Sequence, residues 1–331
     1  IHAEAWQLEP GGWIEGQYDV PPDAWYFQSN RQPSMPFAVL LEIALQPCGW
    51  LAAYLGSALR SDTDLSFRNL SGEAVLHEEV FSDAGTLTTR VRITKVSEAG
   101  GMMIESFDIQ IWRAGRIVYS GDTTFGFFSA DALAQQVGVR DAAARLHTLD
   151  QNERRRAKPI APAALDIPGL PGPKLRMIDT IDVFVPDGGP DGLGFIRGVK
   201  QVDPDEWFFA AHFYQDPVCP GSLGLESFLQ LLKVVAVERW GESVLRTHRF
   251  EPIIVGPAHR WIYRGQVIPS NERIEVEAVV TRIEETPRQT IVAIEKANYA
   301  PSLELAFLVA EELKAARTPA KAAEPVALGG L

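Results

Sequence analysis

The chain has 331 residues, of which 46% are hydrophobic and 22% charged, as is typical of a soluble globular protein large enough for two modules. Its formal net charge of -12 argues against a nucleic-acid-binding protein, because phosphate binding requires a clustered positive face. Cys48 and Cys219 have no Cys or His at metal-ligand spacing, so neither a disulfide framework nor a metal site is expected, and a reducing, cytoplasmic location is favoured. No stretch is expected to reach the apolar length of a membrane span, and no signal peptide is recognised.

Residues 1–129 are predicted to form one module in which strands follow a single long helix. Between residues 36 and 59, apolar side chains recur at spacings of three and four, as in a helix. Strands are predicted at 13–20, 86–96, 102–113 and 116–128. Strands that follow one central helix indicate an α+β fold with a sheet wrapped around that helix.

A connector and a second module are predicted to follow. Residues 130–172 are rich in Ala and charged side chains and then in Pro, which is typical of a linker. The second module is predicted over 173–313, with strands at 175–185 and 193–202 and a helix at 223–240. Residues 314–331 form a predicted linker tail rich in Ala and Pro.

Both ends of the chain suggest a fragment of a longer polypeptide. The first residue is Ile rather than Met, and the tail has the composition of a linker. The strand predicted at 175–185 would align before and around residue 1. We therefore expect the first module to lack part of an edge strand.

The two modules are copies of one another. An offset of 182 residues aligns Trp13 with Phe195 and the run Pro22-Asp23-Ala24-Trp25 with the run Pro204-Asp205-Glu206-Trp207. An offset of 184 residues then aligns the two helices, pairing Pro36 with Pro220, Leu41 with Leu225, Glu42 with Glu226 and Gln46 with Gln230. At the first offset His212 falls on Asn30, so the histidine is present only once.

His212 and Glu226 lie on either side of a Pro-Gly turn that opens the second helix. A carboxylate among the Leu side chains of this helix is expensive to bury without a partner or a task. Gly221 follows Pro220 at the helix N-terminus, where free backbone N–H groups and the helix dipole can hold a developing oxyanion. We therefore predict an acid/base site, rather than a structural histidine bonded to a nearby carbonyl group.

The sequence around this turn resembles a known family. The run from His212 to Gln230 and the run from Trp261 to Pro269 are very similar to the bacterial β-hydroxydecanoyl-ACP dehydratase/isomerase. In the first copy, Met35-Pro36 and residues 41–50 resemble the degenerate first half of dehydratase regions of polyunsaturated fatty acid synthases. The resemblance implies a double hotdog, in which two antiparallel sheets, each wrapped around a long central helix, pair side by side.

The resemblance also implies a reaction. A (3R)-hydroxyacyl thioester on the phosphopantetheine arm of an acyl carrier protein would lose water and give a 2-enoyl thioester, with no cofactor, in polyunsaturated fatty acid or polyketide synthesis. The carrier protein and neighbouring synthase domains are the implied partners. His212 would remove the C2 proton, Gly221 would hold the carbonyl oxygen, and a carboxyl group would protonate the departing hydroxyl. Glu226 stands where the isomerising relatives carry Asp, which argues against double-bond isomerisation.

Two carboxylates compete for the role of acid. In the homodimeric relatives, each site takes its His from one protomer and its acid from the helix of the other. If fusion preserves that geometry, His212 faces Glu42, with Gln46 one turn further along the helix. Glu226 then faces Asn30 in a vestigial site. Glu226 is the alternative acid because it keeps the family's position beside His212 in sequence.

Further candidates are expected to line an acyl channel or its mouth. The candidates for substrate binding are Phe213, Tyr214, Pro220, Leu225, Gln46 and Gln230. Arg260 and Arg264 flank the family-like strand and are candidates for docking an acidic carrier protein. The simpler interpretation of both arginines is a solvated position on a half-exposed strand.

Three other functions stay open at this level. A hotdog thioesterase would need a carboxylate and a water but no histidine before the Pro-Gly turn. An inactive scaffold or carrier-binding module is conceivable because half of the chain has lost its histidine. A hydratase acting on free coenzyme A esters is the third. The sequence also leaves open the acyl chain length and association into a homodimer.

Overall fold

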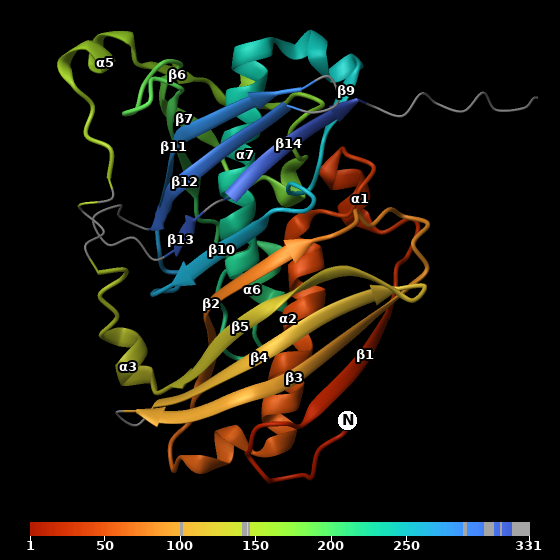
Figure 1. Cartoon of the computed structure of the whole chain (residues 1–331). Coiled ribbons are helices and arrows are strands. Elements are labelled where there is room, and N and C mark those ends of the chain that lie inside the picture. The colour runs from red at the N-terminus through yellow and green to blue at the C-terminus, as the bar shows by residue number, and fades with distance from the viewer. Residues whose placement is uncertain are drawn as a thin grey trace, which may run out of the picture.

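The computed structural model of the chain describes residues 1–99, 102–140, 144, 146–286, 290–300, 308–311 and 313–319. Within these residues, two halves of similar architecture follow one another, each with a long helix against a curved antiparallel sheet (Figure 1). This is the double hotdog that the resemblance implied.

The elements of the two halves follow a similar order, with β7 and β9 as additional strands in the second half. The first half consists of β1 (Trp13–Asp19), α1 (Trp25–Asn30), α2 (Phe37–Leu55), the 3₁₀ helix η1 (Ser57–Arg60), β2 (Ser66–Leu76), β3 (Thr86–Ala99), β4 (Met102–Arg113) and β5 (Arg116–Phe128). The second half consists of β7 (Thr180–Val185), β8 (Phe195–Gln201), α6 (Trp207–Ala211), α7 (Gly221–Trp240), η4 (Glu242–Arg246), β9 (His248–Phe250), β10 (Ala258–Tyr263), β11 (Arg273–Glu285), β12 (Thr290–Ala300), β13 (Leu308–Glu311) and β14 (Leu313–Pro319).

The two long helices begin at equivalent prolines. Pro36 and Pro220 are the N-caps of α2 and α7, and both have extended backbone that cannot continue a helix backwards. Gly56 ends α2 at a φ of 85°, a left-handed conformation that suits glycine. Every residue of α7 from 222 to 237 is buried, so this helix lies at the core of the second half.

A single antiparallel ladder joins the two halves. In the described residues, the order of the sheet is β1-β3-β4-β5-β2-β10-β13-β12-β11-β8-β7-β6, so β2 of the first half pairs with β10 of the second. Gly72 lies opposite Trp261, and a Cβ at Gly72 would come within 2.2 Å of the indole. The absence of a side chain at Gly72 therefore lets the buried Trp261 cross the join.

The segment between the halves has more structure than a linker. Residues 130–172 contain α3 (Ala130–Ala134), α5 (Gln151–Arg156), β6 (Lys158–Ile160) and the 3₁₀ helix η2 (Pro162–Leu165), and η3 (Pro173–Leu175) follows. Strand β6 pairs with β7 and extends the second sheet. Glu153 in α5 accepts hydrogen bonds from His147 and from the backbone of Gly189, which fixes the connector to the second half.

The end of the chain departs from the expected linker tail. Strand β14 covers residues 313–319 and pairs with β12 and β9, so the residues from 314 to 319 belong to the sheet. The boundary at 314 was therefore wrong, because the Ala and basic residues of this strand have the composition of a linker. The rest of the predicted tail, 320–331, lies outside the described residues.

Helix α2 is long and apolar enough to cross a membrane by length and hydropathy alone, contrary to the expectation from the sequence. Half of its apolar window is buried inside the protein, as in the core helix of a folded domain. Its buried residues pack in the same hydrophobic core as strands β3 and β4. The length of α2 is therefore weak evidence for a membrane span.

Candidate active site

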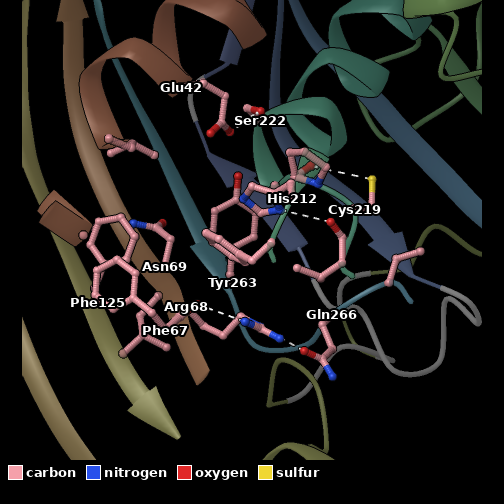
Figure 2. A pocket seen from close by; sticks show the side chains of 18 of the residues that line it. Glu42, Phe67, Arg68, Asn69, Phe125, His212, Cys219, Ser222, Tyr263 and Gln266 are labelled. Carbon is pink, nitrogen blue, oxygen red and sulfur yellow. Dashed lines mark hydrogen bonds between the residues drawn. The ribbon is translucent and has the colours of Figure 1, made fainter. Parts of the chain in front are cut away.

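A cavity of about 210 Å³ lies between the two halves. The first half contributes side chains from α2, from the start of β2 and from the end of β5. The second half contributes the loop after α6, the start of α7, the end of β10 and the residues that follow it (Figure 2). Its lining is mainly apolar, with polar side chains contributed by both halves, as in sites for small acyl ligands. Among the described residues, no group of three or more His, Cys, Asp or Glu side chains is placed to hold a metal ion.

His212 lies in this cavity at the C-terminal end of α6. Its Nδ1 lies 3.0 Å from the carbonyl oxygen of Val218, and the N–H of Val218 donates to the His212 carbonyl at 2.8 Å. A carbonyl oxygen can only accept, so Nδ1 carries the proton and Nε2 holds the free lone pair. Within the described part of the chain, Nε2 makes no hydrogen bond. The loop thus presents the imidazole as a base.

Glu42 lies in the same cavity and comes from α2 of the other half. The Ser222 hydroxyl donates a hydrogen bond of 2.6 Å to its Oε1. Figure 2 shows Glu42 and Ser222 together on one side of the cavity, with His212 below them in the view. The structure therefore brings together a histidine and a carboxyl group from different copies.

Gly221 is the first residue of α7 and also lines the cavity. The first N–H groups of a helix have no acceptor in the helix itself, and the helix dipole makes this end positive. Among the described residues, the Gly221 N–H has no hydrogen-bond acceptor. It is available to a carbonyl oxygen or an oxyanion in the cavity.

Glu226 does not reach this cavity. Its side chain is 2% exposed and its Oε1 accepts a hydrogen bond of 3.2 Å from Gln230. The ammonium group of Lys233, equally buried, lies 3.5 Å from the same oxygen. Glu226 therefore forms a buried ion pair with Lys233 and does not line the cavity that holds His212.

The equivalent site in the first half is closed in three ways. The Asn30 side chain donates a hydrogen bond of 2.8 Å to the Ser34 carbonyl, as His212 does to the Val218 carbonyl, but an amide side chain cannot act as a base. Phe37 stands at the position of Gly221 and is fully buried. The segment that follows the connector engages Gln230 next to Glu226, since the Gln230 side chain donates to the Leu175 carbonyl and accepts from the Met177 N–H.

The other sequence candidates divide into two groups. Those that line the cavity are Gln46, Phe213, Pro220 and Arg264. Those that do not are Tyr214, which is 89% exposed, Leu225 in the core, Gln230 beside Glu226, and Arg260. Tyr214, Leu225 and Gln230 were therefore wrong as residues lining this cavity, because positions on a turn or a fully buried helix cannot be assigned to one face from the sequence.

The two arginines proposed for docking have different environments. Arg260 forms an ion pair with Glu73 across the β2–β10 ladder at 2.7 Å. Arg264 lies at the cavity and donates to the carbonyls of Leu70 and Tyr263. Burial lowers the pKa of Arg264 from its ordinary value.

Several lining residues were not predicted from the sequence. Phe67 and Phe125 stack in parallel at 4.4 Å between ring centroids. Arg68 makes a two-pronged ion pair with Asp216 at 2.7 Å, and this bond holds the pKa of Asp216 below its ordinary value. Phe67 and Arg68 come from β2, whose sequence lacks the regular alternation of apolar and polar residues that predicts a strand.

The FabA-like domain matches residues 3–122 and 170–299. The chain belongs to the FabA-like family. A polyunsaturated fatty acid synthase polypeptide from Thraustochytrium sp. is 32% identical over 298 residues, which are 82% of this chain and 19% of that protein. The chain thus spans about a fifth of the length of this relative.

Two solved structures illustrate what the chain is similar to in three dimensions. The dehydratase domain from the CurJ module of curacin polyketide synthase has a TM-score of 0.50 and 11% identity, covering 94% of this chain and 93% of its own. An acyl-ACP thioesterase from Bacteroides thetaiotaomicron has a TM-score of 0.45 and 8% identity, covering 91% of this chain and 97% of its own. At its identity, the likeness to the CurJ domain concerns the fold alone.

Proposed function

We propose that the chain dehydrates (3R)-hydroxyacyl thioesters carried on an acyl carrier protein to 2-enoyl thioesters, as part of a polyunsaturated fatty acid or polyketide synthase. The observation that carries this proposal is the cavity that holds His212 from one copy and Glu42 from the other. A base and an acid on separate elements can act on two neighbouring carbons at once. The FabA-like family and the synthase relative support the same reaction class.

The steps follow from the side chains. The thioester carbonyl oxygen accepts a hydrogen bond from the Gly221 N–H, which makes the C2 proton more acidic. His212 Nε2 takes this proton while Glu42 gives its proton to the C3 hydroxyl, so that the C3–O bond breaks, water leaves and the C2=C3 double bond forms. The imidazolium then holds the proton taken from C2 and Glu42 is a carboxylate, so transfer of one proton from His212 to Glu42 through water restores both groups. No cofactor is required.

The walls of the cavity fit an acyl thioester. Leu45, Gly49, Phe67 and Phe125 offer an apolar surface on the side of the first half. On the other side, Arg264 and Gln266 provide polar groups for the pantetheine arm. We propose that the acyl carrier protein and the neighbouring synthase domains are the partners of this chain.

The test is incubation of the purified chain with a (3R)-hydroxyacyl carrier protein, followed by mass spectrometry of the carrier. Loss of one water from the attached acyl group is expected. Release of free acid with an unmodified carrier would instead identify a thioesterase. The (3S) enantiomer serves as the control, and equal turnover of coenzyme A esters would show that the carrier is not recognised.

A further inference from the structure

Tyr263, the last residue of β10, is a buried side chain that lines the cavity. Its hydroxyl oxygen is inaccessible to solvent and makes no hydrogen bond within the described part of the chain. A buried hydroxyl without a partner is unfavourable, and Phe would fill the same space without that penalty. The unpaired hydroxyl therefore points to a partner that arrives with the ligand.

The phenol lies directly against the start of α7. A Cβ built on Gly221 would come 2.5 Å from the Tyr263 hydroxyl oxygen and 2.3 Å from Cζ. Only glycine at this position leaves room for the ring, whereas the equivalent position of α2 carries Phe37. Figure 2 shows the Tyr263 ring beside His212, with its hydroxyl on the side of Glu42.

The Tyr263 hydroxyl is suited to donate a hydrogen bond. Burial, and secondarily the charge of Glu42, raise the pKa of Tyr263 well above its ordinary value. The hydroxyl therefore keeps its proton throughout the neutral range. A carbonyl oxygen is the acceptor that an acyl thioester would bring to this place.

We propose that the Tyr263 hydroxyl is a second hydrogen-bond donor to the thioester carbonyl oxygen, beside the N–H of Gly221. This inference rests on the proposed function, in which His212 makes negative charge develop on that oxygen. Two donors from different elements, α7 and β10, then fix the carbonyl in the orientation that aligns the C2 proton with His212. Tyr263 is thus assigned as a catalytic residue.

The test measures the carbonyl directly and does not require turnover. A saturated acyl-pantetheine thioester with a ¹³C-labelled carbonyl has no C3 hydroxyl and cannot be dehydrated. Difference infrared spectroscopy of its complex should show a lower carbonyl stretching frequency with the unmodified protein than with Tyr263→Phe, because a hydrogen bond weakens the C=O bond. An equal frequency in the two complexes would overturn the proposal, whether or not the protein proves to be a dehydratase.

Two further measurements separate this role from a structural one. With hydroxyacyl substrate, Tyr263→Phe should lower kcat on the order of 100-fold and leave KM within about threefold, as for loss of one oxyanion donor. Tyr119→Phe is the matched control, because it removes a buried hydroxyl that bonds His259 at 3.0 Å outside the cavity. Tyr119→Phe should lower Tm and leave the carbonyl frequency unchanged, whereas Tyr263→Phe should not lower Tm. Unchanged kcat in Tyr263→Phe would also contradict the assignment.

Discussion

The hydroxyl of Ser222 donates a 2.6 Å hydrogen bond to the carboxyl group of Glu42 and so links the start of α7 to the N-terminal third of α2. The first copy has no equivalent bond, because Ala38 stands at the position of Ser222. A bond between the two helices at this point fixes the Glu42 side chain relative to Gly221 and His212, which belong to the other copy. Ser222 is therefore a positioning residue for the proposed acid.

Ser222→Ala is expected to lower kcat about tenfold, with little change in KM, because Glu42 loses the contact that orients it. Ser227→Ala is the matched control. The Ser227 hydroxyl is also buried in the same helix and donates a hydrogen bond of 2.6 Å to the Gly224 carbonyl, away from the cavity. Steady-state kinetics on both variants test the idea, and an equal loss of kcat in the two would show that Ser222 acts only through helix packing.

Glu42→Gln should remove most of the dehydratase activity, by about 10²- to 10⁴-fold in kcat, since Gln cannot give a proton to the departing hydroxyl. Glu226→Gln should keep kcat near the normal value because Glu226 lies outside the cavity. This variant leaves the buried Lys233 without its counter-charge and should lower Tm. The double variant Glu226→Gln with Lys233→Met removes both charges and gives a second test if the single variant folds poorly. The reverse ranking of kcat would mean that acid and base come from one copy.

His212→Asn should abolish dehydration, with a loss of kcat of about 10³-fold or more, and His212→Ala should do the same. Asn can keep the bond to the Val218 carbonyl, as Asn30 does with Ser34, so the fold should persist by circular dichroism. Asn30→Ala breaks the corresponding bond in the first copy and should leave kcat unchanged. Enoyl product at a near-normal rate from His212→Asn would remove His212 from the mechanism.

The positions of the long helices and the placement of Glu42 and His212 at one cavity followed from the sequence. Pro36 and Pro220 have a local effect on the backbone that holds in any fold, so the predicted start of the first helix lies within one residue of the observed start and that of the second within two. The duplication added the rest. In a dimer of such copies, each site combines the histidine of one copy with the helix of the other. This arrangement predicted that Glu42 and His212 lie at the same site.

The remainder of the site depends on tertiary contacts with no local signal. Arg68 and Asp216 are 148 residues apart, and nothing in either segment indicates that they form an ion pair. Residues 66–73 of β2 are all of intermediate burial, so the strand lacks the alternation by which strands are recognised. The buried ion pair of Lys233 with Glu226 is likewise visible only in the folded structure, where both side chains lie in the core.

The main product should be the trans-2-enoyl thioester, with isomerisation weak or absent. Isomerisation requires a proton to be delivered to C4. Glu226 stands where the isomerising relatives have Asp, and Glu42 is its equivalent in the first copy. The longer side chain places its carboxyl group differently relative to the acyl chain. NMR of the product distinguishes the two regioisomers. A dominant cis-3-enoyl product would contradict this prediction.

Glu105 on β4 gives a prediction about stability that is independent of catalysis. Its side chain is 0% exposed, and burial raises its pKa from 4.5 to about 6. Between these pH values the folded protein holds a proton that the unfolded chain has released. The free energy of unfolding therefore contains a contribution that falls as the pH rises from 4.5 towards 6.

Glu105→Gln removes this ionisation while keeping the size of the side chain. Relative to the unmodified protein, the variant should gain almost nothing in stability at about pH 4 and about 2 kcal/mol at about pH 8, by linkage from the pKa shift. Urea denaturation at several pH values measures the difference directly. Glu98→Gln on β3 makes the same substitution at an exposed carboxyl group and serves as the control. A Glu105→Gln difference that is constant across this pH range would show that the buried carboxyl does not titrate within it.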